Sequence, residues 1–392
     1  MKYNFDKKIK RYNTGSVKWD LVNELFGGED LLPMWIADMD FEIPEPVIKA
    51  LRDRAMQGIF GYTACMPSYY EATIEWLKKR HTWQIEKEWI VFCPGVVPAL
   101  NMLIQTFTIP GDKVILQLPV YYPFMSAVKN NGRIIENNPL IFKNGRYQMN
   151  FDDLREKAKD PLSKLIVLCS PHNPVGRVWT KDELIQLGEI CIKNEILIIS
   201  DEIHSDLILN GFRHTPFASI SNDFLKHSIT CTSPSKTFNL AGLQTSNVII
   251  SDPEKRNKFS QKLDSNGIHS PNVFGALALE AAYRHGEDWL NQLLDYLQNN
   301  LKYLKNFIRE KIPKIKVIEP EATYLVWLDC RGLGLNRNEL KKFMLGEAKV
   351  ALDDGYIFGK SEGDGFERIN IACPKATLKK GLKRIENAVQ NL

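Results

Sequence analysis

The chain has no long apolar run and no dense run of one charge. No stretch approaches the roughly 20 apolar residues that a membrane-spanning helix needs, and the N-terminal MKYNFDKKIK lacks the apolar core of a secretory signal. The 51 basic and 47 acidic residues leave a net charge of only +4, without the basic cluster that is typical of nucleic-acid binding. We therefore expect neither a membrane nor a nucleic acid as a partner.

Cysteine pairs and metal-binding motifs are also absent. The seven cysteines extend from Cys65 to Cys373 without a Cys-x-x-Cys pair, and an odd, scattered set is typical of a reducing compartment rather than of a disulfide framework. The seven histidines are scattered as well, and no His-Glu-x-x-His occurs. These absences predict a cytoplasmic protein with no metal site.

The middle of the chain alternates short apolar runs with helical patterns, which is typical of an α/β fold with a largely parallel sheet. A capping-box sequence at Thr180 predicts the start of one of these helices. The apolar runs are too short for surface helices and are expected to be buried strands. They are Lys113–Leu118, Leu165–Cys169, Ile196–Ser200, Ile229–Thr232 and Asn247–Ile250.

A chain of 392 residues exceeds what one hydrophobic core usually serves, so two domains are expected. Apolar residues recur every three or four positions from about Gly286 to Lys311, which predicts one long amphipathic helix before Pro313. We interpret this helix as the connector between a large domain, residues 46–286, and a small α+β domain, residues 287–392. The small domain is expected to have strands at Lys316–Ile318, Tyr324–Leu328 and Arg368–Ala372 and helices at about Arg337–Leu345 and Thr377–Gln390.

A lysine and an aspartate each follow one of the predicted strands. Asp201 comes directly after Ile196–Ser200, and Lys236 follows Ile229–Thr232 in the sequence Ser-Pro-Ser-Lys. The lysine amine can condense with the aldehyde of pyridoxal phosphate, while the aspartate can keep the pyridine nitrogen protonated. Taken alone, such a lysine is usually a solvated turn residue, and such an aspartate usually caps a helix.

Two segments are candidates for binding the phosphate group. Ser233 and Ser235 follow a predicted strand, where the backbone amides around Lys236 can form an anion-binding nest. Gly95 and Val96 open a predicted helix, and free N–H groups at a helix start attract a phosphate. The second signal is weak by itself, because the loop contains no Ser or Thr.

Three further residues are candidates for contacts with the cofactor ring. Asn173 can donate a hydrogen bond to the ring oxygen O3′, and the Asn173–Pro174 bond is a candidate for the cis form. His204 can contact the same oxygen, although a lone histidine is more often structural. Tyr121 can stack on a flat heterocycle, whereas the adjacent Tyr122 is equally consistent with a core position.

An arginine near the C-terminus is a candidate for binding the substrate. Arg368 lies in Phe366–Ala372, which alternates as a strand does, and an arginine on such a strand is usually a surface ion-pair partner. Facing a cleft, it can instead hold a substrate α-carboxylate through two parallel hydrogen bonds. We therefore expect a small-molecule amino acid as the substrate.

These segments, in this order, resemble the fold-type I (aspartate aminotransferase-like) pyridoxal phosphate enzymes, and among them the MalY/PatB-type C–S lyases. The similarity extends along most of the chain. It is carried by Lys18–Asp20, Pro33–Phe41, Gly61–Thr63, Pro94–Val97, Tyr121–Phe124, Ser170–Pro174, Ser200–His204, Ser233–Gly242 and Arg368–Pro374.

The resemblance implies a homodimer whose active sites lie at the subunit interface. It implies that Tyr62 of one subunit binds the phosphate held by the other, although a tyrosine after a glycine turn is otherwise typical of a packed aromatic. Residues 1–45 are expected to pack with the small domain, and Trp35 is expected near the substrate. One position departs from the wider family: Gln244 stands where many aminotransferases have a phosphate-binding arginine.

The activity that the resemblance implies is α,β-elimination from cystathionine- or cysteine-type amino acids, giving a thiol, pyruvate and ammonia. Lys236 would remove the Cα proton, and Tyr121 would help to protonate the leaving thiolate. An aminotransferase needs the same lysine and aspartate, so the sequence leaves this alternative open. It also leaves open a lyase with an additional regulatory, protein-binding role.

Overall fold

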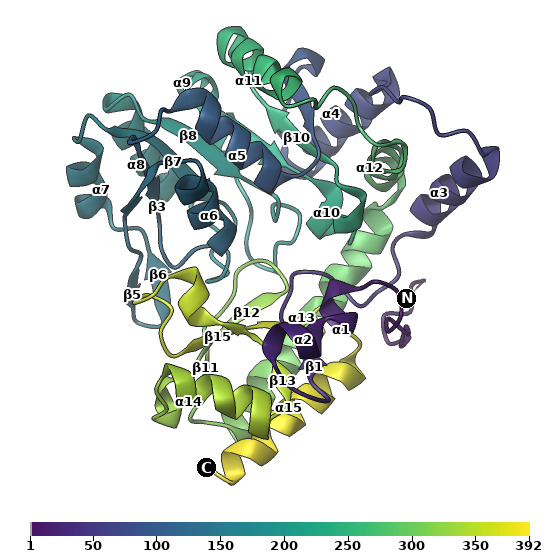
Figure 1. Ribbon diagram of the computed structural model, residues 1–392, viewed down its shortest axis with the longest axis vertical. Helices are drawn as coiled ribbons and strands as arrows, with labels where there is room; N and C mark the ends of the chain where they lie inside the picture. Colours follow the sequence, from purple (N-terminus) through teal and green to yellow (C-terminus); the bar gives the residue numbers. More distant parts are fainter. Residues whose placement is uncertain (1) are drawn as a thin grey trace.

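A seven-stranded sheet organises the larger part of the chain in the computed structural model, which describes residues 2–392 (Figure 1). The strand order is β2-β10-β9-β8-β7-β3-β4, and β10 runs antiparallel to the other six. The strands are β2 (Ile90–Cys93), β3 (Lys113–Leu116), β4 (Ile134–Asn137), β7 (Ser163–Cys169), β8 (Leu197–Asp201), β9 (Ser228–Thr232) and β10 (Ser246–Ile249). The expected α/β fold with a mostly parallel sheet is therefore confirmed.

All five strands predicted for this sheet are present, with ends that differ by at most two residues. The sequence did not single out β2 and β4, the two edge strands. Both contain partly buried positions, and the first residue of β4 is exposed. An edge strand of this kind lacks the continuous apolar run that identifies a strand covered on both faces.

Helices cover both faces of the large sheet (Figure 1). On one face, Leu103 and Phe259 pack with Val167 of β7, and on the other, Leu184 packs with Ile198 of β8. The capping box at Thr180 forms as predicted. The first layer contains α5 (Val96–Phe107), α6 (Tyr122–Asn130) and α11 (Pro253–Ser265), and the second contains α7 (Phe151–Ala158) and α8 (Lys181–Lys193).

The predicted long helix is α13 (Glu287–Lys311), and Figure 1 shows it extending from α12 to a second sheet. This sheet is antiparallel, with the order β11-β12-β15-β14. The helix expected at residues 337–345 ends at Lys342 and continues as a π turn at Phe343–Glu347. The elements here are β11 (Lys316–Val317), β12 (Leu325–Asp329), β14 (Asp353–Asp354), β15 (Phe366–Asn370), α14 (Arg337–Lys342) and α15 (Lys375–Gln390).

The N-terminal segment lies against the C-terminal part of the chain. Its strand β1 (Leu32–Pro33) pairs in parallel with β13 (Val350–Ala351). The domain boundaries at residues 45 and 286 stay predictions. Within residues 2–392, no helix combines the length and apolar character that crossing a membrane requires. The remaining elements are α1 (Val17–Asp20), α2 (Val22–Phe26), α3 (Glu45–Gln57), α4 (Pro67–His81), β5 (Ile141–Lys143), β6 (Arg146–Gln148), α9 (Asn222–Lys226), α10 (Pro234–Thr237) and α12 (Val273–His285).

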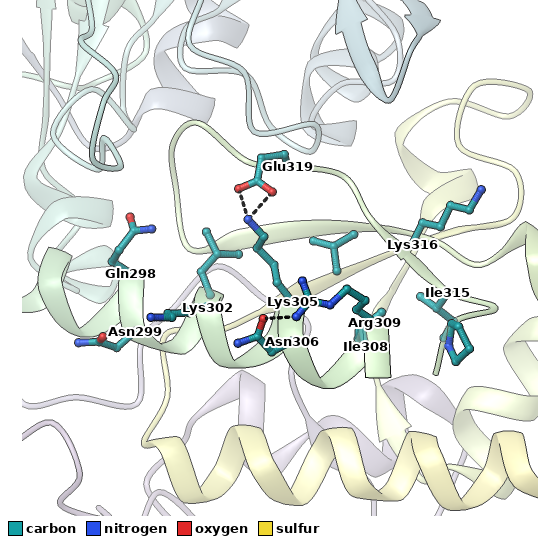
Figure 2. A pocket seen from close by; sticks show the side chains of 13 residues that line it. Gln298, Asn299, Lys302, Lys305, Asn306, Ile308, Arg309, Ile315, Lys316 and Glu319 are labelled. Atoms are coloured by element: carbon teal, nitrogen blue, oxygen red, sulfur yellow. Dashed lines mark hydrogen bonds and ion pairs between the residues drawn. The ribbon is translucent and has the colours of Figure 1, made fainter. Parts of the chain in front are cut away.

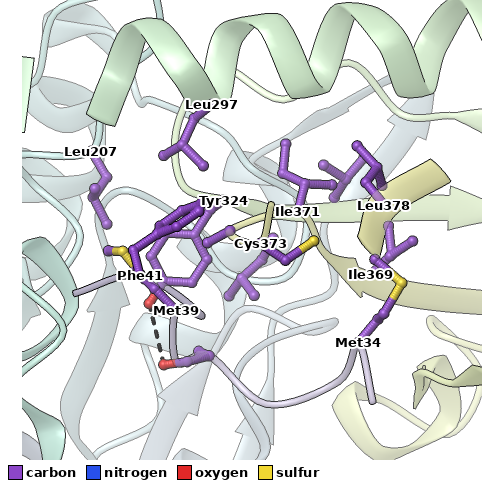
Figure 3. Packing of buried hydrophobic residues seen from close by; sticks show 14 of the residues in the cluster. Met34, Met39, Phe41, Leu207, Leu297, Tyr324, Ile369, Ile371, Cys373 and Leu378 are labelled. Carbon is purple, nitrogen blue, oxygen red and sulfur yellow. Dashed lines mark hydrogen bonds between the residues drawn. The ribbon is translucent and has the colours of Figure 1, made fainter. Parts of the chain in front are cut away.

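One hydrophobic cluster joins the N-terminal segment to α13 and the small sheet (Figure 3). Met39 and Phe41 pack in this cluster with Leu297 of α13 and with Tyr324 and Ile371 of the small sheet region. Leu297 and Ile371 are almost completely buried. Because these large side chains are buried, the backbone of residues 36–41 is held in one position. We call this segment, residues 36–41, the strap.

We predict that Leu297→Ala lowers the free energy of unfolding by about 2–5 kcal/mol, since it leaves a cavity in this cluster. Denaturant unfolding followed by circular dichroism would measure the change. The control is Asn299→Ala on the exposed face of α13, for which a change within about 0.5 kcal/mol is expected. Equal effects of the two substitutions would contradict the assignment of Leu297 to the core.

Candidate active site

A pocket of about 200 Å³ lies at the carboxyl ends of β7, β8 and β9. Open α/β sheets bind their ligands at this edge. Cys169 ends β7, Asp201 ends β8, and Lys236 is the fourth residue after β9, within α10. Eight of the predicted site residues line the pocket: Gly95, Val96, Tyr121, Asn173, Asp201, His204, Ser235 and Lys236.

The amine of Lys236 is held by the strap. Its Nζ donates a hydrogen bond to the carbonyl oxygen of Ala37 at 2.8 Å, and the hydroxyl of Tyr324 donates to the same oxygen at 3.2 Å. Burial, reinforced by the positive charge of Arg368, lowers the pKa of Lys236 to about 8, against the opposing effect of Asp38 and Asp201. This amine therefore reaches its reactive, deprotonated form far more readily than a surface lysine.

Asp201 lies in an apolar setting at the sheet edge. Its Oδ1 accepts a hydrogen bond from the amide of Ile203 at 3.1 Å, and the structure gives Oδ2 no partner within residues 2–392. Burial raises the pKa of Asp201 to about 7, with Ile203 opposing and Glu202 adding to the rise. A cation placed in the pocket would stabilise the carboxylate, so Asp201 is suited to holding a protonated ring nitrogen.

His204 and Tyr121 supply two rings to the pocket. Burial lowers the pKa of His204 to about 3, with the charges of Lys236 and Arg368 acting in the same direction, so its imidazole is neutral. Its buried Nδ1 has no hydrogen-bond partner within residues 2–392. Burial also raises the pKa of Tyr121, which keeps this phenol protonated and able to donate.

Arg368 lies beside the pocket on β15, and it is not exposed. Its Nη1 donates to Asn173 Oδ1 at 2.8 Å, and its Nη2 donates to the Trp35 carbonyl at 3.3 Å and to Asp353. Trp35 thus contacts Arg368 through its backbone, while its indole packs edge-on against Phe26. The Asn173–Pro174 bond is cis, as expected.

The start of α5 also lines the pocket. Gly95 is the N-cap of this helix, and the first amides of a helix have no partner within it. Ser235 and Gln244 also line this region. Ser233 does not line the pocket, because its hydroxyl accepts from the Ser235 amide at 3.1 Å and lies 2.6 Å from the Thr245 carbonyl. Its local role is to cap α10.

Tyr62 lies apart from the pocket of its own chain. Its side chain is fully exposed, at 107% of the reference area, on the extended segment between α3 and α4. Ile59 and Phe60 are exposed on the same segment, and Met56 is exposed in the last turn of α3. An apolar patch of this kind is typical of a surface that another molecule covers.

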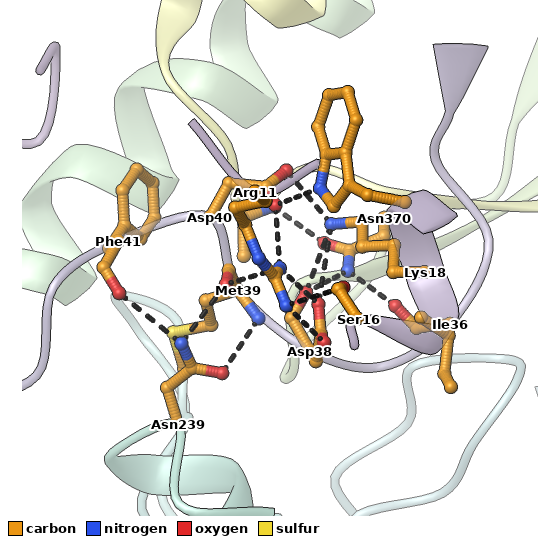
Figure 4. Close-up of polar contacts among 12 residues, drawn as sticks. Arg11, Ser16, Lys18, Ile36, Asp38, Met39, Asp40, Phe41, Asn239 and Asn370 are labelled. Atoms are coloured by element: carbon orange, nitrogen blue, oxygen red, sulfur yellow. Dashed lines mark hydrogen bonds and ion pairs between the residues drawn. The ribbon is translucent and has the colours of Figure 1, made fainter. Parts of the chain in front are cut away.

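The strap is fastened by a network of buried and partly buried charges and amides (Figure 4). Arg11 forms a bidentate pair with Asp38 at 2.8 and 2.9 Å, and Lys18 pairs with Asp40 at 2.9 Å. Although burial disfavours the Asp38 carboxylate, the Arg11 hydrogen bonds and the Lys18 charge hold its pKa below the usual value.

Two asparagines hold the backbone of the strap from opposite sides. Asn370 of β15 donates to the carbonyls of Ile36 and Asp38, each at 2.7 Å. Asn239, three residues after Lys236, accepts from the Met39 amide at 2.9 Å. The Ala37 carbonyl that holds Lys236 is therefore fixed from both the small sheet and the lysine loop.

Sequence reasoning missed several residues of this site. Ala37 acts through its backbone oxygen, which no side-chain motif reveals. Cys169 and Ile203 are apolar neighbours of Asp201, and strand ends of this kind are common. Asp353 is fifteen residues from Arg368 and becomes its neighbour only through the antiparallel pairing of β14 with β15. Pairing of these two strands could not be read from either segment alone.

A larger groove of about 700 Å³ lies between α13 and β11 (Figure 2). It shares no lining residue with the Lys236 pocket. Its charged lining residues are all at least partly exposed, and Lys305 pairs there with Glu319 at 2.6 Å. The smaller pocket instead contains a buried base and a buried acid whose pKa values are shifted, and these mark it as the candidate active site.

The chain matches the family model described as aminotransferase class I and II over residues 29–385. Cystathionine beta-lyase PatB of Bacillus subtilis is 49% identical, covering 98% of this chain and 100% of PatB. Protein MalY of Escherichia coli is 34% identical over 99% of each chain. The crystal structure of cystalysin from Treponema denticola, which contains a pyridoxal 5′-phosphate cofactor, superposes with a TM-score of 0.97 and 40% identity over 100% of both chains.

We predict that the free Lys236 amine reacts with an amine-selective reagent with a half-maximal rate at about pH 8. The rate rises with pH because the deprotonated amine is the nucleophile. Peptide mass spectrometry of the ligand-free protein would measure it. In Arg368→Gln the midpoint should move upward, because the arginine charge lowers the lysine pKa. A midpoint near the ordinary lysine value of about 10.4 in the unaltered protein would contradict the prediction.

Proposed function

Since the chain belongs to the aminotransferase class I and II family, we propose that it is a pyridoxal phosphate-dependent carbon–sulfur lyase. It cleaves cystathionine- or cysteine-type S-substituted amino acids by α,β-elimination. The observation that carries this proposal is one pocket in which a lysine of lowered pKa and a buried aspartate lie together. The choice of lyase over aminotransferase is supported by the 49% identity to a cystathionine beta-lyase.

The polar groups of the pocket suit this cofactor. The free Oδ2 of Asp201 would hold the pyridine nitrogen, and the amide NH₂ of Asn173, whose Oδ1 already serves Arg368, would donate to O3′. Neutral His204 would lie near the same oxygen. The start of α5 at Gly95 and Val96, with Ser235, would receive the phosphate. Gln244 contributes no positive charge there, so neutral donors and the helix end carry most of that role.

When bound, pyridoxal phosphate supplies an aldehyde that holds the substrate amine and a protonated ring that accepts electrons from Cα. Lys236 removes the Cα proton, and its lowered pKa makes it a competent base near neutral pH. The Ala37 carbonyl, which also accepts a hydrogen bond from the Tyr324 hydroxyl, holds this amine in place. Arg368 orients the substrate through its α-carboxylate, and Tyr121, protonated and at the pocket wall, delivers a proton to the leaving sulfur.

The proposed reaction balances without an external oxidant or keto acid. Lys236 takes the Cα proton, the Cβ–S bond breaks with its electron pair on sulfur, and the thiolate gains a proton. The remaining three-carbon fragment takes up water and yields pyruvate and ammonium. Elimination thus needs only water as co-reactant, whereas transamination leaves the amino group on the cofactor until a keto acid removes it.

We further propose a homodimer in which Tyr62 of one subunit binds the phosphate held by the other. The exposed apolar side chains at Met56, Ile59, Phe60 and Tyr62 support an interface on this segment. The seven cysteines are all free thiols, which supports a cytoplasmic location. Division into residues 1–45, 46–286 and 287–392 is part of the same proposal, supported by the pairing of β1 with β13.

Incubating the protein with cystathionine and no keto acid separates the lyase from the aminotransferase. We expect pyruvate to form over many turnovers, measured by coupling to lactate dehydrogenase. Lys236→Ala should lower this rate by at least about a hundredfold, because the general base is lost. A single turnover that stops with the amino group retained on the cofactor would instead establish the aminotransferase.

Mixing two inactive variants tests whether each active site contains Lys236 of one subunit and Tyr62 of the other. Lys236→Ala and Tyr62→Ala are expected to be strongly impaired separately. After the subunits exchange at equal concentration, about a quarter of the sites in a two-fold dimer have neither change. Recovery of about a quarter of the normal pyruvate rate would support the proposal. No recovery, with exchange verified by mass spectrometry of the intact dimers, would exclude a contribution of Tyr62 to the partner's site.

A further inference from the structure

The substrate-binding arginine of the proposed lyase already has a carboxylate partner. Asp353 of β14 contacts Nη2 of Arg368, and the two side chains are 6% and 2% exposed. The guanidinium also stands over the ring of Phe358 at 4.8 Å. Arg368 is thus held in a closed protein environment in which its charge is balanced before any ligand arrives.

The hydrogen bonds of Arg368 leave no complete edge for a second carboxylate. A carboxylate can form two parallel hydrogen bonds with a guanidinium in two ways, either with Nε and Nη2 or with Nη1 and Nη2. Both arrangements use an N–H of Nη2. Each N–H of Nη2 has an acceptor, one in Asp353 and the other in the Trp35 carbonyl. The buried Nε has no partner within residues 2–392, and Nη1 donates once, to Asn173. A two-point contact with a ligand therefore requires competition at Nη2.

The charges around Asp353 disfavour the addition of a ligand carboxylate to the Asp353–Arg368 pair while Asp353 stays ionised. Arg368 of β15 faces it across the strand pair, while Glu367 and Asp354 occupy the adjacent register position. The Tyr121 and Tyr122 phenols at the start of α6 are also close enough to interact with its charge. Asp354 is paired with Arg337 at 3.2 Å, which leaves Arg368 as the cation in contact with Asp353. One arginine facing two ionised carboxylates would leave an uncompensated negative charge in a buried setting, which is strongly disfavoured.

We propose that Asp353 is a specificity-determining residue that competes with the substrate α-carboxylate for Arg368 and takes up a proton when the substrate displaces it. This inference rests on the proposed substrate-binding role of Arg368. Burial already raises the pKa of Asp353, and the Arg368 charge opposes that rise. When the ligand carboxylate replaces Asp353 at Arg368, the arginine charge no longer opposes the rise in the Asp353 pKa. Asp353 is therefore protonated to a greater extent in the ligand-bound protein than in the free protein.

The proposal has two consequences for binding. Carboxylate affinity falls as pH rises, by at most about tenfold per pH unit, because binding is coupled to uptake of one proton. Anions that offer only a carboxylate bind weakly, because they must displace Asp353 without any other anchor. Amino acids gain a second anchor through their amine at the Lys236 end of the pocket. Asp353 thereby favours amino acids over the simple carboxylic acids of similar size.

A suitable probe is 3-(methylthio)propionate, which keeps the carboxylate and thioether of a substrate but has no amine to react with the cofactor. Its binding to the cofactor-loaded protein would be measured by isothermal titration calorimetry from about pH 6 to about pH 9, where the probe stays ionised. We expect affinity to decrease across this range in the unaltered protein. Asp353→Asn should bind the probe at least about tenfold more tightly at the upper end, with a flatter pH profile.

The matched control is Asp354→Asn, which removes the adjacent carboxylate, one that pairs with Arg337 rather than with Arg368. Its affinity should stay closer to that of the unaltered protein than the affinity of Asp353→Asn does, and it should still decrease as pH rises. The Asp353–Arg368 contact is intact in this variant, although the Asp354 charge no longer adds to the rise in the Asp353 pKa. Arg368→Lys should weaken probe binding both in the otherwise unaltered protein and in the Asp353→Asn variant. Equal probe affinity in Asp353→Asn and the unaltered protein overturns the proposal, and so does an undiminished affinity in Arg368→Lys.

A second measurement needs no variant and keeps the test valid if Asp353→Asn does not fold. Titrations in buffers of different ionisation enthalpy give the number of protons taken up with the probe. A positive number, at most about one, supports the proposal, and a value of zero overturns it. Pyruvate formation from cystathionine is assayed separately, so zero uptake in an active lyase refutes only the role of Asp353, whereas absence of elimination refutes the proposed function.

Discussion

The position of one backbone carbonyl, that of Ala37, connects the three parts of the chain. It accepts hydrogen bonds from Lys236 and from Tyr324, and its own segment is held by Asn370 on one side and Asn239 on the other. The hydrophobic cluster beneath the strap adds a large apolar contribution to this arrangement. A reactive amine needs a fixed position, and here the fixed position comes from an N-terminal segment remote from the lysine in sequence.

Burial has opposite effects on the two central groups of the pocket, and both effects are useful. It lowers the pKa of Lys236 and raises that of Asp201, because each charged form loses hydration. A base is thereby prepared at one point, and an acid that ionises when a cation arrives is prepared at another. Arg368 contributes to the lysine shift, so the proposed substrate-binding residue and the proposed base are electrostatically linked.

Much of this could be predicted from the sequence, because the signals were local. The covered strands are continuous apolar runs, the capping box at Thr180 is contained in four residues, and Asp201 ends one strand while Lys236 follows the next. Groups that act through the backbone, such as Ala37 and the Trp35 carbonyl, leave no such signal. Asp353 was missed because its contact with Arg368 arises from strand pairing, and β2 and β4 were missed because edge strands are only partly covered.

The strap also has a consequence for how the protein is made. Asn370, which holds the carbonyls of Ile36 and Asp38, lies in β15 near the end of the chain. The large sheet ends at residue 249 and has all its strands well before that asparagine leaves the ribosome. A product of translation that stops before residue 370 therefore contains every strand of the large sheet but lacks the asparagine whose hydrogen bonds fix Ile36 and Asp38 on either side of Ala37.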